Sequence, residues 1–196
     1  MKKITKRFLT SNNACYEGVQ WWIDNNKPTD VIETVKNLLT DKHSDWANWL
    51  IVRLMNHIQQ IKYAVYAAEL VLPIYENKFS NDYSARNAIK AAKKYIDNPS
   101  KENSAAAAYA ANAAYVAYAA AAAYAAYAAY VAYAAAYAAA AAYAAYAAYV
   151  AYAAAYAAAY AADAAYAADA ADAVSIRRVV RKKILNYGIK LLKGEQ

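Results

Sequence analysis

The stretch YAAYAAYVAYAAAYAAAAA (Tyr124–Ala142) is followed at once by its near copy YAAYAAYVAYAAAYAAAYA (Tyr143–Ala161), a repeat of 19 residues. Both copies belong to a longer tract, Ala105–Ala162, that contains only alanine, tyrosine, three valines and one asparagine. Alanine is the strongest helix former because it loses no side-chain entropy in a helix. The tract therefore predicts α-helix throughout, but it carries no charged side chain from which a reaction could be inferred.

The tyrosines of the tract are spaced mostly three or four residues apart, so at about 100° per residue they drift around the helix and reach all its sides. A single rod would expose rings on every face with no partner to cover them, which favours several shorter helices. We expect bends or crossings at the alanine runs Ala119–Ala123 and Ala138–Ala142. Short stretches do keep one apolar face, namely Tyr130, Tyr133 and Tyr137, and again Tyr149, Tyr152, Tyr156 and Tyr160.

The composition of the whole chain also indicates an all-α protein. Its three prolines lie before the tract and it has only three glycines, so few tight turns are available and a sheet is disfavoured. The 196 residues fit one domain, in which an amphipathic N-terminal part, residues 1–104, packs with Ala/Tyr-repeat helices and a basic C-terminal helix, residues 105–196. The expected architecture is a multi-helix bundle or a short α-solenoid with close-packed Ala/Tyr-rich helices.

The N-terminal part shows apolar residues at helical spacing behind polar capping residues. We expect the first helix to run through Trp22, and a later helix from about Ile61 to end at Pro73, because proline lacks the N–H donor that continues a helix. A last packed helix carries Ile184–Leu192 despite Gly188. The predicted caps are, in chain order, Asn12 or Asn13, Thr29 or Asp30, Ser44 or Asp45, and the segment Asn98-Pro99-Ser100.

Cysteine usage and hydropathy bear on the compartment. The single cysteine, Cys15, cannot form an internal disulfide, and no signal sequence is visible at the N-terminus, which favours a cytoplasmic protein. The uncharged tract exceeds the roughly 20 residues of a transmembrane helix. It lacks leucine, isoleucine and phenylalanine, however, and would place many tyrosine hydroxyls at mid-bilayer depth. We therefore expect no membrane partner.

Several segments carry a resemblance that spans nearly the whole chain. They are DWANWLIVRLM (Asp45–Met55), IKYAVYAAELVLPIYE (Ile61–Glu76), ARNAIKAAKKYIDNPSKEN (Ala85–Asn103), the alanine–tyrosine repeats and KILNYGIKLL (Lys183–Leu192). In these segments the chain resembles a family of small, alanine-rich helical immunity proteins of bacteria and phages, similar to the immunity proteins of polymorphic toxin systems. The resemblance implies a neutralising, non-catalytic role, in the host cytoplasm if a phage carries the gene.

One position departs from the pattern of that family. Its members carry Arg-Pro-Arg ahead of an Ala-Ile pair, whereas this chain has Ser84-Ala85-Arg86. The resemblance therefore carries over Arg86 alone as a candidate ligand contact.

Basic residues gather near both ends of the chain, which has a net charge of +7. Arginine binds phosphate through charge-assisted hydrogen bonds, and tyrosine rings beside it offer faces on which a nucleobase can stack. The alternative is a solvated basic face beside rings that mainly pack helices together. The candidate ligand contacts are Arg177, Arg178 and Arg181 for phosphate, and Tyr149, Tyr152 and Tyr156 for stacking.

A second candidate patch lies in the N-terminal part, where Trp46 and Trp49 share a helix face with Arg53. A guanidinium over an indole makes a cation–π contact, and such a pair can hold a planar ligand. The alternative is a tryptophan-rich core patch formed with Trp21 and Trp22.

Acidic residues punctuate the end of the tract at Asp163, Asp169 and Asp172. Paired carboxylates serve acid–base chemistry or hold metals, but ion pairs with the nearby arginines fit these positions better. We retain Asp163 and Asp169 as residues at the ligand site. The two histidines have no cysteine or carboxylate at ligand spacing, so the sequence predicts no metal, no cofactor and no catalytic residue, and hence a non-enzymatic protein.

Two functions fit these features. The first is sequestration of a small anionic, nucleotide-like immune signal without cleavage, in bacterial or phage immunity and anti-defence, by a monomer or a homo-oligomer. The second is an immunity protein that binds and inhibits a cognate protein toxin through an exposed face, where tyrosine is a favoured anchor. An inhibitor of a nucleic-acid-degrading toxin is usually acidic, so the positive charge favours the nucleotide-like ligand.

Overall fold

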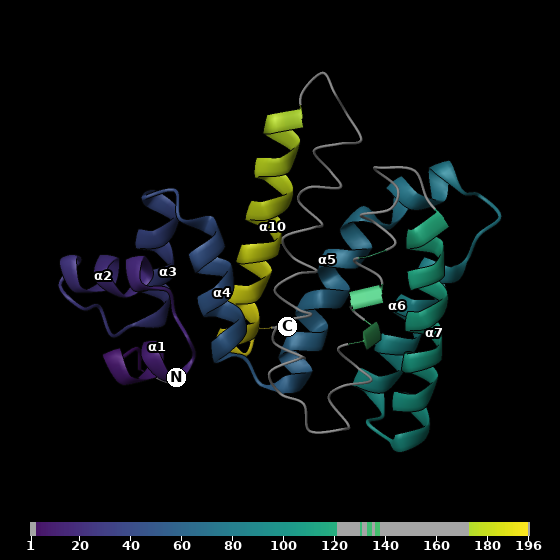
Figure 1. The fold of residues 1–196 in the computed structure, drawn as a ribbon, viewed down its shortest axis with the longest axis horizontal. Helices are drawn as coiled ribbons and strands as arrows, with labels where there is room; N and C mark the ends of the chain where they lie inside the picture. The colour runs from purple at the N-terminus through teal and green to yellow at the C-terminus, as the bar shows by residue number, and fades with distance from the viewer. Residues whose placement is uncertain (1–2, 121–129, 131–132, 135, 138–172, 196) are drawn as a thin grey trace.

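The computed structural model describes residues 3–120, 130, 133–134, 136–137 and 173–195, and within these residues it is all-α, without a strand (Figure 1). The predicted fold class is thereby confirmed. The labelled helices are α1 (Lys6–Ser11), α2 (Tyr16–Asp24), α3 (Val31–Thr40), α4 (Ser44–Leu54), α5 (His57–Lys78), α6 (Ser84–Asp97), α7 (Lys101–Ala120) and α10 (Ala173–Lys193).

The helices follow one another across the molecule in nearly chain order, with one exception (Figure 1). Helices α1, α2 and α3 lie at one end, α4 packs on α3, and α5 leads to the α6–α7 hairpin at the other end. The exception is α10, which comes from the end of the chain and packs against both α4 and α5. The boundary predicted between the N-terminal part and the repeat helices, after residue 104, falls inside α7. The last helix, α10, packs with helices of the N-terminal part.

Helix α10 can approach α4 and α5 because of a glycine. A Cβ at Gly188 would lie 2.7 Å from Cγ2 of Ile51 and 2.8 Å from Cε2 of Tyr63, both of which are buried. The Tyr63 hydroxyl donates a hydrogen bond to Oδ1 of Asn48 over 2.8 Å, and burial raises the pKa of this tyrosine. The predicted packing of the last helix is confirmed, with Ile184 also fully buried in this core.

Helices α6 and α7 pack against each other, and each buries a row of alanines. These alanines recur every three or four residues along each helix, so they share one face. Small side chains on facing helices allow a close approach of the backbones. Their buried members are Ala85, Ala88 and Ala92 in α6 and Ala107, Ala111 and Ala114 in α7.

The predicted first helix through Trp22 corresponds to α2, but its predicted caps, Asn12 or Asn13, are wrong, and α1 was not predicted. Asn12 ends α1, with its side-chain amide donating to the carbonyl of Phe8 over 2.8 Å. Asn13 then adopts the left-handed backbone, with φ of 59°. Helix α2 is capped by Cys15, whose Sγ accepts from an amide N–H over 3.3 Å.

Of the other predicted caps, two are confirmed and one is wrong. Asp30 caps α3, where its Oδ1 accepts from the N–H of Glu33 over 2.8 Å, and Ser100 accepts from the third residue of α7 over 3.2 Å. Ser44 is the first residue of α4 rather than its cap. Its hydroxyl instead accepts a hydrogen bond from Arg181 of α10 over 2.7 Å.

The predicted end of a helix at Pro73 is also wrong, because α5 continues to Lys78. Pro73 and Glu69, four residues before it, are both exposed, so the helical hydrogen bond that proline cannot make is lost at the surface of α5. The buried side chains on either side of the proline, Val71 and Tyr75, hold the helix to the core.

The alanine–tyrosine tract is described only in part. The rings of Tyr130 and Tyr133 lie 5.5 Å apart, and those of Tyr133 and Tyr137 lie 5.6 Å apart, so the predicted ring seam is confirmed there. The second predicted seam and the bend at Ala138–Ala142 lie outside the described residues. None of the described helices combines the length and the apolar character that a membrane span needs.

Candidate ligand-binding pocket

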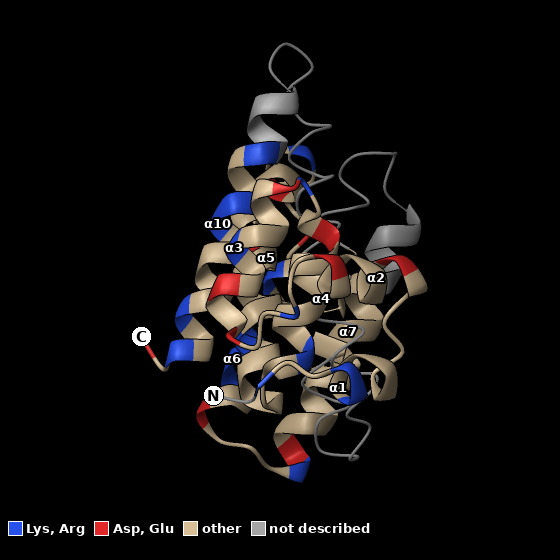
Figure 2. Ribbon diagram, turned by 90° about the vertical axis from the view of Figure 1, so that its left-hand side faces the viewer, with Lys and Arg blue, Asp and Glu red and all other residues tan. Residues whose placement is uncertain are grey.

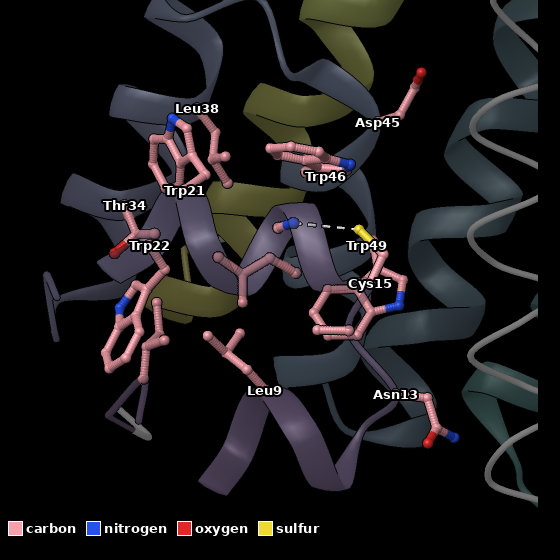
Figure 3. A pocket seen from close by; sticks show the side chains of 14 residues that line it. Leu9, Asn13, Cys15, Trp21, Trp22, Thr34, Leu38, Asp45, Trp46 and Trp49 are labelled. Carbon is pink, nitrogen blue, oxygen red and sulfur yellow. Dashed lines mark hydrogen bonds between the residues drawn. The ribbon is translucent and has the colours of Figure 1, made fainter. Parts of the chain in front are cut away.

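A pocket of about 300 Å³ lies among α1, α2, α3 and α4, and all four tryptophans of the chain line it (Figure 3). Trp21 and Trp22 come from α2, and Trp46 and Trp49 come from α4. Aliphatic side chains complete the wall, and the polar atoms are few. The remaining lining residues are Ile4, Leu9, Asn13, Ala14, Cys15, Gly18, Thr34, Leu38, Asp45 and Leu50.

The indoles of α2 are held in place through their N–H groups. Nε1 of Trp21 donates to Oδ2 of Asp41 over 2.8 Å, and Nε1 of Trp22 donates to the carbonyl of Pro28 over 2.9 Å. A hydrogen bond to an indole N–H sets the orientation of the ring, because that group is its only donor. The faces of these rings are therefore pre-oriented against the pocket.

The ring of His43 contacts one tryptophan of α2 and one of α4. The ring of His43 stacks on Trp46 with centroids 4.0 Å apart and planes 11° apart, and it meets Trp21 edge-on at 6.3 Å. Sequence reasoning missed this role of His43. Its position three residues before Trp46 is the signal that could have found it, because residues at that spacing share a helix face.

The predicted contact between Arg53 and Trp49 is confirmed. The guanidinium carbon of Arg53 lies 5.8 Å from the centroid of the Trp49 ring, within the range of a cation–π interaction. The predicted alternative, a tryptophan-rich core patch, holds for Trp22, which is buried, whereas the other three indoles are half-buried along the pocket wall. Cys15 and Gly18, which sequence reasoning did not place here, also line the pocket, and a Cβ at Gly18 would lie 3.9 Å from Trp46 of α4.

Basic residues recur along α10 (Figure 2), and one of them, Arg181, contacts the pocket residue Asp45. Nη1 of Arg181 donates to Oγ of Ser44 over 2.7 Å, and its Nη2 lies 3.5 Å from Oδ1 of Asp45. Asp45 lines the tryptophan pocket as well, whereas Arg181 lines a small neighbouring cavity together with Ser44 and Asp45. Arg178 lies one turn earlier on α10 and is exposed. Arg177 lies on α10 too, but its side chain is outside the described residues.

Arg86 lies apart from this site. It belongs to α6, on the other side of α5 from α4 (Figure 1). Its guanidinium donates from Nε and Nη2 to the two carboxylate oxygens of Glu76 over 2.5 and 2.6 Å. These hydrogen bonds raise the pKa of Arg86 above its ordinary value. The arginine carried over from the resemblance is therefore engaged in an ion pair rather than placed at the pocket.

The remaining sequence predictions concern metal ligands and five further ligand contacts. Among the described residues, no group of three or more histidines, cysteines and carboxylates has the geometry of a metal site. The predicted contacts that lie outside the described residues are Tyr149, Tyr152, Tyr156, Asp163 and Asp169.

A second groove, of about 500 Å³, lies between α5, α6 and α10 and has a different character. Tyr66 and Tyr187 stack in it with centroids 4.1 Å apart, and burial, followed by the charge of Glu69, raises the pKa of Tyr187. Its charged lining comprises Lys62, Glu69, Lys93, Asp97 and Glu195, and the amine of Lys93 pairs with Glu69. Both linings carry one more acid than base, so charge does not separate the two sites, and the four indole faces make the tryptophan pocket the better candidate for a planar ligand.

Comparison with known proteins assigns no family, since no family model, no curated protein and no solved structure matches the chain. The resemblance to immunity proteins stays a prediction from the sequence motifs. The chemistry of the tryptophan pocket is therefore the basis for a functional proposal.

Proposed function

We propose that this protein is a non-enzymatic binding protein of bacterial or phage immunity and anti-defence that sequesters a small, anionic, nucleotide-like ligand in the cytoplasm. The observation that supports this function is a pocket walled by four indoles, one of whose lining residues, Asp45, pairs with the guanidinium of Arg181. The indoles take the planar ring of the ligand, and Arg181 takes its phosphate.

The energetics of this arrangement favour retention of a ligand. Stacking of a nucleobase on an aromatic side chain contributes about 1–3 kcal/mol per base. A phosphate gains charge-assisted hydrogen bonds from a guanidinium, which are roughly twice as strong as neutral ones. Polar side chains in the lining are few, namely Asn13, Cys15, Thr34 and Asp45, which suits orientation of a bound ring rather than chemistry upon it.

A panel of nucleotides tests the proposal directly. The full-length protein is titrated with AMP, cyclic AMP, ADP-ribose and cyclic dinucleotides, while tryptophan fluorescence reports binding because the indoles line the pocket. The bound ligand is then released by heat and identified by mass spectrometry. We expect at least one member to bind and to be recovered intact; a chemically changed ligand would show an enzyme instead.

Variants locate the binding. Trp46→Ala removes one stacking face, so we expect a loss of about ten- to hundredfold in affinity. The matched control is Tyr109→Ala, because Tyr109 is 79 % exposed on α7, away from the pocket. An equal loss in both variants, or no binding by any member of the panel, would refute the proposed function.

A second candidate function is the inhibition of a protein toxin. It is favoured by tyrosines whose rings are largely exposed, Tyr16 at 77 % and Tyr109 at 79 %, since exposed tyrosines serve as anchors in protein interfaces. Co-expression with a toxin encoded beside the gene tests it. Protection that is lost in Tyr109→Ala and kept in Trp46→Ala would support toxin binding over sequestration.

A further inference from the structure

Asp45 belongs both to the tryptophan pocket and to an ion pair with Arg181. Its side chain lines the tryptophan pocket, and its Oδ1 lies 3.5 Å from Nη2 of Arg181. Figure 3 shows its carboxylate at the edge of the pocket, pointing away from the indole rings. The acid therefore stands where the pocket meets the basic helix α10.

The two partners of this ion pair differ in exposure. The side chain of Asp45 is 80 % exposed, whereas that of Arg181 is 27 % exposed. An ion pair with so exposed a carboxylate adds little stability, so the acid can leave its partner easily. The guanidinium is held independently, because its Nη1 donates to Ser44 over 2.7 Å. Arg181 thus keeps its place when Asp45 moves away.

The size of the pocket limits what can enter it. About 300 Å³ lies at the lower end of the range for ligand pockets, which is roughly 300–1,000 Å³. A volume at this limit suits one base with its sugar better than two bases. A phosphate placed at Asp45 would come within reach of Arg181, which lines the neighbouring cavity together with Ser44 and Asp45.

We propose that Asp45 is a built-in substitute for the phosphate of a mononucleotide: it pairs with Arg181 until that phosphate displaces it, while the base enters the tryptophan pocket. This inference rests on the proposed function and adds to it the ligand class and a competing group. Since a carboxylate and a phosphate compete for one guanidinium, Asp45 lowers affinity and selects ligands whose phosphate binds Arg181 more strongly than a carboxylate does.

The test compares AMP with adenosine on the full-length protein and on Asp45→Asn, by calorimetry at fixed ionic strength. Removal of the competing charge is expected to raise the ratio of AMP affinity to adenosine affinity by about three- to tenfold, as expected for an exposed ion pair of up to about 1 kcal/mol plus the lost repulsion. Asp24→Asn is the matched control, because it changes the net charge equally on an exposed residue of α2 outside the pocket.

The outcomes separate this inference from the proposed function. If AMP binds the wild-type protein and Asp45→Asn leaves the ratio unchanged or lowers it, Asp45 is no substitute for phosphate and the sequestration function stands. The same holds if the control raises the ratio as much as Asp45→Asn does. If AMP binds neither protein while a cyclic dinucleotide does, the mononucleotide assignment fails alone. If no nucleotide binds, both proposals fail.

Discussion

The helices α1–α4 and the hairpin α6–α7 bury side chains of opposite size. Rigid indoles gather around Gly18 in the first region, and a pocket of about 300 Å³ lies between them. In the second region α6 and α7 pack against each other, and each buries a row of alanines almost completely. The indoles of this region leave a pocket between them, whereas alanines let two backbones approach closely. Within one all-α bundle, side-chain size thus decides where a ligand can enter.

The largest expected effect comes from enlarging a side chain in the alanine interface. Ala111→Leu adds carbons to a position of α7 that is 0 % exposed, so overpacking is expected to lower the free energy of unfolding by about 3 kcal/mol. Urea denaturation followed by circular dichroism measures it. Ala106→Leu is the matched control, because Ala106 is exposed on the same helix. Equal effects of the two changes would show that the interface is not closely packed.

The next effect concerns the junction of the two regions, where α10 meets α4 and α5. The Cβ of Gly188→Ala would overlap the buried side chains of Ile51 and Tyr63 at 2.7 and 2.8 Å. We expect a net loss of about 2 kcal/mol in stability, even though alanine favours a helix over glycine by about 1 kcal/mol. Asn186→Ala, at an exposed position of α10, should be nearly neutral. A stabilised Gly188→Ala protein would contradict this packing.

A smaller effect is expected at the turn between α5 and α6. The buried Tyr75 donates a hydrogen bond to Oδ2 of Asp82 over 2.7 Å, and burial, with this bond, raises the pKa of Tyr75 to about 12. Tyr75→Phe leaves the carboxylate without this donor, so we expect a loss of about 1–2 kcal/mol at pH 7. Thermal unfolding measures it, with Tyr16→Phe, at an exposed position, as the control.

The same pair has a defined pH dependence. Burial pushes the pKa of Asp82 upward, but hydrogen bonds from Ser84 and Tyr75 outweigh it, so the pKa lies below its ordinary value. A lowered carboxyl pKa contributes stability that is present above the unfolded pKa of about 3.9 and is lost as the pH falls through the folded value. The difference between wild type and Tyr75→Phe should therefore shrink below about pH 4. A difference that grows in acid would contradict this assignment.

The smallest change in stability is expected for Gly18→Leu, because the pocket has space for the added side chain. Gly18→Leu places its Cβ 3.3 Å from Sγ of Cys15 and 3.9 Å from Trp46, so the thiol must give way slightly. Replacement of a helical glycine offsets this, and we expect a net change within about 1 kcal/mol together with loss of AMP binding. Gly18→Ala separates helix propensity from filling of the pocket. Severe destabilisation by leucine would show that the space is not available.

Local features were the ones that the sequence predicted well. The all-α class follows from alanine content, and the contact between Arg53 and Trp49 follows from their spacing of four residues. The caps at Asp30 and Ser100 depend on neighbours within three residues. Predictions failed where a distant partner overruled a local preference, as at Ser44, whose hydroxyl accepts from a residue 137 positions away.

The amino-acid order was sufficient for helical structure, for a tryptophan-rich face and for the basic character of the last helix, because propensity and the geometry of one helical turn act over a few residues. The tertiary structure alone brought α2 and α4 together around Gly18, and set Arg181 beside Asp45 at the pocket edge. Such contacts depend on how whole helices pack, and packing is a property of the assembled core rather than of any segment.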